Sequence, residues 1–204
     1  LPMRERCLDC PHEGSNVMTR LLLPDESELT AAQRDVISEV IAGRRGKVPA
    51  PMIAWLRNPE FARRAQNLGE LLRFETSLPP TLSELAILVC ARHWTSHHEW
   101  TAHKKIALAA GVDPKTIEDI ASGRSPHFTG LQEEMVYQVS STLLATGKVP
   151  TTLYQQGHAA LGEKAMVELV GILGYYSFVA LTLNAFEIGL PESFAPELAA
   201  PDRA

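Results

Sequence analysis

The sequence predicts an all-α fold of about eight helices. Helix-start signals, either Ser/Thr-x-x-Glu/Gln or Asn/Asp-Pro, recur along the chain, and glycine or proline follows most of the apolar stretches. No stretch alternates apolar and polar residues as a half-buried strand does. A length of 204 residues is enough for a core without disulfides or metal. We expect an N-terminal extension over 1–28, a single domain over 29–195 and a C-terminal tail over 196–204.

The first helices are marked by caps at both ends. A capping box at Thr30–Gln33 opens one helix, which Gly43 ends. A short apolar turn follows at 52–56. The pair Asn58–Pro59 opens a helix with leucines at helical spacing, and Pro79–Pro80 ends it.

The middle of the chain has two more apparent capping boxes. The first, Thr81–Glu84, opens a helix that extends to about Thr95. The second, Ser96–Glu99, opens a helix that closes on Gly111.

The remaining helices follow from similar signals. Asp113–Pro114 begins a short helix that Gly123 ends. Further helices are expected at 129–146, 152–160 and 163–188. A faint repeat links Glu84-Leu-Ala-Ile-Leu-Val with Glu168-Leu-Val-Gly-Ile-Leu, which suggests two related helical hairpins.

One stretch, 169–186, has 18 residues without a charge, the lower limit for a membrane span. We interpret it as a core helix or an oligomer seam, because it contains tyrosines and lacks a basic flank. We therefore expect no membrane partner. A net charge of −5 and the lack of a basic run argue against a nucleic-acid partner.

The three cysteines, Cys7, Cys10 and Cys90, favour a reducing, cytoplasmic location. Cys7 and Cys10 form a CxxC that could bind zinc with His12, but no second pair is present, so an inert pair is the favoured interpretation. Cys90 lies in an apolar run and is expected to be an inert core thiol.

Four histidines lie within eleven residues: His93, His97, His98 and His103. Glu99 and His103 are one helical turn apart and could form a proton-handling pair. The alternative is a surface ion pair beside a capping box. His98 and His103 are five apart, which does not fit a zincin, and the pair His93 and His97 lacks a third ligand, so we expect no metal.

A set of residues in the middle of the chain resembles the carboxymuconolactone decarboxylase family, which includes the alkylhydroperoxidase D-like proteins. The matching text is Ser83-Glu84-Leu-Ala-Ile-Leu, Ala91-Arg92, Glu99-Trp100-x-x-His103 and Ala109-Ala-Gly111-Val. The likeness extends over most of the chain, from Gly46-Lys-Val-Pro through Asn58-Pro59 to Leu161-Gly-Glu and Gly174-Tyr-Tyr. The resemblance implies an alkylhydroperoxidase D-like helical fold and a homo-oligomer, whether dimer, trimer or hexamer.

The family's peroxidase branch has two cysteines where this chain has Ser96 and Glu99. A hydroxyl cannot cycle through sulfenic acid and disulfide, so the resemblance points to the decarboxylase branch. It implies a cofactor-free lyase acting on a small carboxylated lactone or a related organic acid.

The resemblance and the chemistry together assign candidate residues. Glu84, Glu99 and His103 are the candidate catalytic residues, with His103 as proton donor held by Glu99. The candidate substrate-binding residues are Arg92, Ser96, His98, Trp100, Tyr175 and Tyr176. Each has a structural alternative: Glu84 as the end of a capping box, Arg92 in a buried ion pair, and the aromatic residues as core. Two other functions stay open, an antioxidant peroxidase and a non-catalytic oligomeric binding protein.

Overall fold

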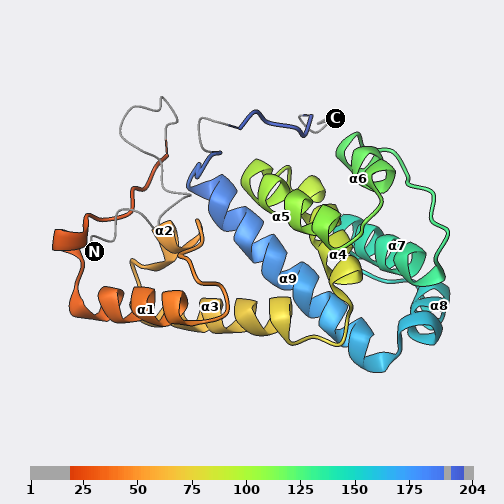
Figure 1. Ribbon diagram of the computed structural model, residues 1–204. Coiled ribbons are helices and arrows are strands. Elements are labelled where there is room, and N and C mark those ends of the chain that lie inside the picture. Colours follow the sequence, from red (N-terminus) through yellow and green to blue (C-terminus); the bar gives the residue numbers. More distant parts are fainter. Residues whose placement is uncertain (1–18, 191–193, 200–204) are drawn as a thin grey trace. The chain divides into compact units, whose positions relative to one another are not determined.

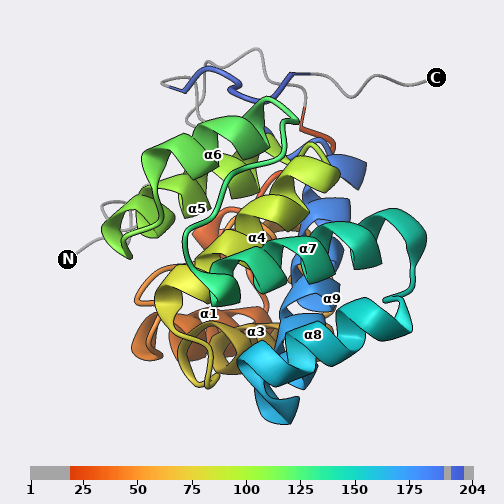
Figure 2. The ribbon, with the colours of Figure 1, turned by 90° about the vertical axis from the view of Figure 1, so that its right-hand side faces the viewer.

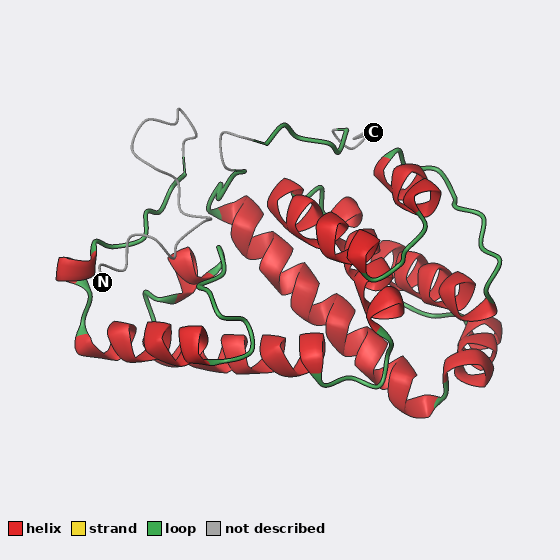
Figure 3. Cartoon of the chain, viewed as in Figure 1, coloured by secondary structure: helices red, strands yellow, loops and turns green. Residues whose placement is uncertain are grey.

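The computed structural model describes residues 19–190 and 194–199, and its regular structure is helical (Figures 1 and 3). That part of the chain forms nine α-helices and one short 3-10 helix, Glu26–Glu28, and contains no β-strand. The prediction of an all-α fold is confirmed. The one helix beyond the expected eight is Met52–Trp55, a stretch that we expected only as an apolar turn at 52–56.

The chain packs as two compact units. Of the described residues, the first unit comprises 19–74, 182–190 and 194–195, and the second comprises 75–181 and 196–199. The single domain expected over 29–195 stays a prediction, because division into compact units does not show whether the parts fold independently.

The first unit contains α1 (Ala31–Ala42), α2 (Met52–Trp55) and α3 (Pro59–Phe74). The capping box that opens α1 is confirmed, because Thr30 Oγ1 accepts from the Gln33 amide at 3.2 Å and Gln33 Oε1 accepts from the Thr30 amide at 2.8 Å. Asn58 caps α3 as expected by accepting from the Phe61 amide at 3.1 Å.

The second unit contains α4 (Pro80–His93), α5 (His97–Ala109), α6 (Pro114–Ala121), α7 (Leu131–Thr146) and α8 (Thr151–Leu161). The last helix, α9 (Glu163–Ala185), belongs to this unit up to Leu181. The centre of the unit is α4, which is buried continuously from Leu82 to Ala91. It packs against α5, α6 and α7, and α7 packs against α8 (Figure 2).

Two capping boxes expected in this unit are wrong. The helix α4 begins at Pro80, and its N-cap residue Pro79 makes no side-chain cap bond. Ser96 is the N-cap of α5, but its side chain makes no cap bond either. In both places the glutamate that would complete the box is buried: Glu84 bonds to His103, and the Glu99 carboxyl has no partner among the described residues.

The apolar helix α9 is long and apolar enough to cross a membrane by length and composition alone. Of its most apolar window, 56% is buried within the protein, as in a core helix. Its hydrogen bonds in the second unit agree with this interpretation: Ser177 Oγ accepts from the Trp94 indole at 2.9 Å and lies 3.5 Å from Cys90 Sγ. The sequence similarity between 84–89 and 168–173 does not extend to function, since Glu168 accepts from the backbone amide of Ser77 at 2.8 Å.

Candidate functional site

A carboxylate and an imidazole meet inside the second unit. Glu84, on α4, and His103, on α5, are joined by a 2.7 Å hydrogen bond between Oε2 and Nδ1. Their side chains are only 5% and 9% exposed. Because an ionised carboxylate can only accept, the shared proton belongs on Nδ1, and Nε2 is left to face another group.

An aromatic side chain from a third helix fixes the plane of the imidazole. Tyr176, on α9, packs edge-on against His103, with ring centroids 4.9 Å apart and an interplanar angle of 86°. Tyr175 packs edge-on against Tyr176 in turn, at 5.4 Å. Both tyrosines are buried, so three helices hold the histidine in place.

The prediction that Glu99 is the hydrogen-bond partner of His103 is therefore wrong. We predicted that Glu99 would hold it, because the two residues are one turn apart on one helix. Glu84 makes that bond instead, and both Glu99 carboxyl oxygens are buried without a hydrogen-bond partner among the described residues. The helical spacing was visible in the sequence, whereas the approach of α4 to α5 depends on tertiary packing.

Burial gives Glu99 unusual acid–base properties. Removal from water disfavours the charged form, and this raises the pKa of Glu99 well above its ordinary value. The neighbouring Ser96 Oγ is also buried and has no partner within the described chain. The two residues form a polar patch beside the first turn of α5.

The nearby thiol is not activated. Burial, and next the charge of Glu99, raise the pKa of Cys90. A thiol in this state is neither a nucleophile nor a redox centre at neutral pH. Cys90 is the single cysteine in the described residues, since Cys7 and Cys10 lie outside them, with His12.

The turn between α4 and α5 has a strained backbone. Thr95 has a φ of 49°, a conformation that a β-branched residue rarely adopts. Its amide donates to the Arg92 carbonyl at 3.1 Å, and the next amide, that of Ser96, donates to the Ala91 carbonyl at 2.9 Å. These bonds set the direction in which α5 leaves α4, and therefore the position of His103.

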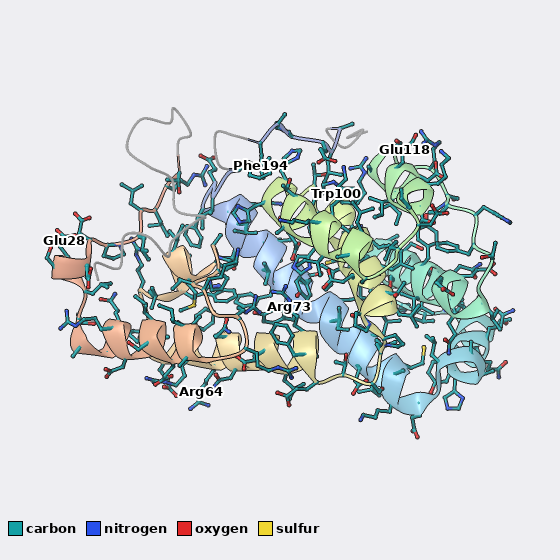
Figure 4. All side chains as sticks on the ribbon, in the orientation of Figure 1. Glu28, Arg64, Arg73, Trp100, Glu118 and Phe194 are labelled. Atoms are coloured by element: carbon teal, nitrogen blue, oxygen red, sulfur yellow. The ribbon has the colours of Figure 1, made fainter. Side chains whose placement is uncertain are left out.

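The other predicted residues lie at different distances from the pair. Trp100 lies on α5 (Figure 4). It is fully buried, and its indole donates to Glu197 at 3.4 Å. His98 is half-buried on the first turn of α5. Arg92 is not brought to the Glu84–His103 pair: its guanidinium donates to Thr95 Oγ1 and to the Ala199 carbonyl, each at 3.4 Å.

One further contact has no signal in the sequence. Glu197, in the C-terminal segment of the second unit, accepts from Trp100 and also pairs with Lys104. Nothing in the spacing of an apparent tail predicts a partner almost a hundred residues away. The expected tail over 196–204 is thus, over its described residues, attached to α5.

Comparison with known families identifies the segment that carries these residues. Residues 59–135 match the model of the carboxymuconolactone decarboxylase family. The match confirms the resemblance seen in the sequence, and it includes Glu84, Glu99 and His103. No curated protein matches the chain.

The comparison therefore shows similarity to the carboxymuconolactone decarboxylase family over this segment. Within it, the described residues include no group of three or more His, Cys, Asp or Glu side chains that could hold a metal ion. The arrangement orients the His103 imidazole against Glu84, and burial raises the pKa of the Glu99 carboxyl.

Proposed function

We propose that the protein is a lyase that removes CO₂ from a small carboxylated lactone or a related organic acid without a cofactor. The observation that carries the proposal is the buried 2.7 Å bond between Glu84 and His103, inside the segment that matches the decarboxylase family. A buried, oriented imidazole is suited to general acid–base catalysis, which is what this reaction requires.

The reaction needs an acid and an oxyanion partner. As the bond between the carboxylate carbon and the ring carbon breaks, its electron pair passes into the conjugated carbonyl and gives an enolate. A hydrogen-bond donor near the enolate oxygen stabilises that charge, and an acid must then protonate carbon. Water resupplies the proton, so the substrate carboxylate and one proton become CO₂ and the lactone.

His103 fits the role of that acid. Glu84 accepts the Nδ1 proton, which orients the ring and leaves Nε2 directed away from the carboxylate. Tyr176 keeps the ring from turning. In this proposal Nε2–H donates first to the enolate and then to carbon, while Glu84 balances the positive charge on the ring.

Glu99 has a second role in the proposal. Because burial raises its pKa, it carries a proton near neutrality and can donate a hydrogen bond to a substrate oxygen. Ser96 Oγ, unpartnered within the described residues, can add a second polar contact. These residues stand where the peroxidase branch has its cysteines, so the same place in the fold would serve a different chemistry.

A thiol peroxidase is the other function that the family allows. It is disfavoured because Ser96 and Glu99 cannot form a disulfide and because the pKa of Cys90 is raised. Consumption of hydroperoxide that is lost in Cys90→Ser would support it against the lyase.

The experiment measures CO₂ release from carboxylated lactones and related acids by mass spectrometry. We expect His103→Gln and Glu84→Gln each to lower kcat/KM by roughly 10²- to 10⁴-fold, as loss of general acid catalysis does. The matched controls are His158→Gln and Glu163→Gln, which alter exposed residues of α8 and α9. A wild-type protein that releases CO₂ from none of these acids, or a His103→Gln variant as active as the wild type, contradicts the proposal.

A further inference from the structure

A second place in the same unit has the character of a ligand site. A half-open hollow of about 170 Å³ lies between α4, α6 and α7. Glu84, Glu99 and His103 are absent from its lining, which consists of described residues throughout. It is therefore separate from the residues that the proposed lyase reaction uses.

The hollow is lined by positive and neutral groups. Arg92 and Arg124 supply two guanidinium groups to its wall, and no carboxylate residue is among the residues that line it. Arg124 is already paired with Asp119 at 2.8 Å and with Glu118 at 3.2 Å. The charge that remains to be balanced is that of Arg92.

Arg92 has an unmet hydrogen-bonding group. Its Nε is buried without a partner, and Arg92 forms no ion pair with a carboxylate among the described residues. Its remaining bonds, to Thr95 Oγ1 and the Ala199 carbonyl, are long, at 3.4 Å each. The Nη2 group of the same guanidinium lies beside Gly123, which also lines the hollow, so an anion in the hollow can reach the Arg92 charge.

The positive charge of Arg92 affects the pKa of a neighbouring histidine. Burial lowers the pKa of His97, and the charge of Arg92 lowers it further. Burial also lowers the pKa of His93, which lines the hollow, so this imidazole is neutral near pH 7 and leaves the charge to the arginines.

The rest of the wall is apolar or aromatic. Val89, Ile120 and Leu144 line the hollow together with Tyr137. At ~30 Å³ for each water, the volume corresponds to roughly six waters, which limits a ligand to one small ring or a short chain. Apolar walls around a guanidinium suit an organic carboxylate better than a fully hydrated inorganic ion.

We propose that this hollow binds a small organic carboxylate, held by the Arg92 guanidinium through charge-assisted hydrogen bonds and covered by the apolar side chains of α4, α6 and α7. The site is additional to the proposed lyase site and does not depend on it.

The test titrates ¹⁵N-labelled protein with benzoate and follows the amide signals by NMR. We expect saturable shifts at Gly123, Tyr137 and Ser141, which line the hollow. Benzamide, which has the same shape without the charge, is expected to bind at least 10-fold more weakly, and so is inorganic phosphate. Phosphate binding as tight as that of benzoate would overturn the choice of an organic ligand.

Variants locate the binding. Arg92→Gln should weaken benzoate binding at least 10-fold, and Ser141→Leu, which fills the hollow, should do the same. Arg64→Gln, an exposed arginine of α3 paired with Glu60, is the matched control and should bind as the wild type does. His103→Gln should also leave these shifts unchanged.

Two results overturn the proposal. One is benzoate binding that survives both Arg92→Gln and Ser141→Leu. The other is binding that His103→Gln abolishes, because benzoate would then occupy the candidate lyase site. If Arg92→Gln does not fold, the wild-type shifts decide the question, since their absence at Gly123, Tyr137 and Ser141 contradicts the site.

Discussion

Glu99 carries the most unusual chemistry of any single residue in the described chain. Its carboxyl is buried, has no partner there, and has a pKa raised by burial. In the unfolded chain the pKa is near 4.5. Between these two values the folded state holds a proton that the unfolded state has lost, so the free energy of unfolding falls as the pH rises.

A variant at this position tests the effect. We expect the free energy of unfolding of the wild type to decline as the pH rises above 4.5, because the folded state keeps the Glu99 proton that the unfolded state loses. Glu99→Gln removes the titration, so its stability relative to the wild type should grow over that range. Urea unfolding at several pH values measures both, with Glu163→Gln as an exposed control.

A difference between wild type and Glu99→Gln that stays constant from pH 4 to pH 8 would show that Glu99 ionises normally. The proposed role as a neutral donor would then fail as well.

At the same scale, the sequence identified the acid–base residues but paired them wrongly. Glu84, Glu99 and His103 could be singled out because their residue types and spacing are unusual. The pairing of His103 with Glu84 could not, since 19 residues separate them and only the packing of α4 on α5 brings them together. The spacing along α5 favoured Glu99 as the partner of His103, but the packing of α4 on α5 gives that place to Glu84.

Among the helices, the caps that need no tertiary partner were predicted best. Thr30–Gln33 and Asn58 cap as expected, and so does Asp113, which accepts from the Lys115 amide at 2.9 Å. The boxes at Thr81–Glu84 and Ser96–Glu99 share the same spacing but do not form. Their glutamates are buried, so a pattern read over four residues could not separate an exposed cap from a buried carboxylate.

The cap of α6 offers a measurement. Asp113→Ala removes the side-chain bond at the start of this helix and should lower the free energy of unfolding by about 0.5–2 kcal/mol. The matched control is Asp25→Ala, because Asp25 precedes a 3-10 helix without making a side-chain cap bond.

Thermal or urea unfolding compares the two variants. Equal losses in both would mean that the Asp113 bond contributes nothing to stability. Since α6 carries Ile120, a smaller benzoate response in Asp113→Ala would also link this helix to the hollow.

For the whole molecule, the surface of α9 bears on assembly. Val167, Val170 and Leu181 are 69%, 48% and 48% exposed, and they recur at heptad-compatible spacing with Gly174 between them. A Cβ at Gly174 would meet nothing within 4 Å, so the surface there is open. An exposed apolar stripe of this kind is typical of a helix that pairs with another copy.

We expect the wild type to be a homo-oligomer in solution and Val167→Lys to shift it toward monomer. Leu131→Lys replaces an equally exposed leucine on α7 and should leave the assembly unchanged. Light scattering after size-exclusion chromatography measures the mass. A monomeric wild type, or an oligomer indifferent to Val167→Lys, would contradict the assignment of this stripe.

At this scale the sequence predicted the helical class and the uncharged helix correctly. It did not predict that one compact unit contains both the chain before Glu75 and the segment that begins at Thr182, because this depends on how the end of α9 packs. Nor could it place Arg92, whose surroundings come from three helices and from Ala199.

The left-handed conformation of Thr95 bears on how this chain could be engineered. Glycine or asparagine adopts a φ of 49° with less strain than threonine, so a screen for heat tolerance should favour such replacements. The same exchange would loosen the corner from which the helix bearing His103 departs. Selection for thermal stability would therefore favour replacement of Thr95, whereas selection for catalytic activity would favour keeping it.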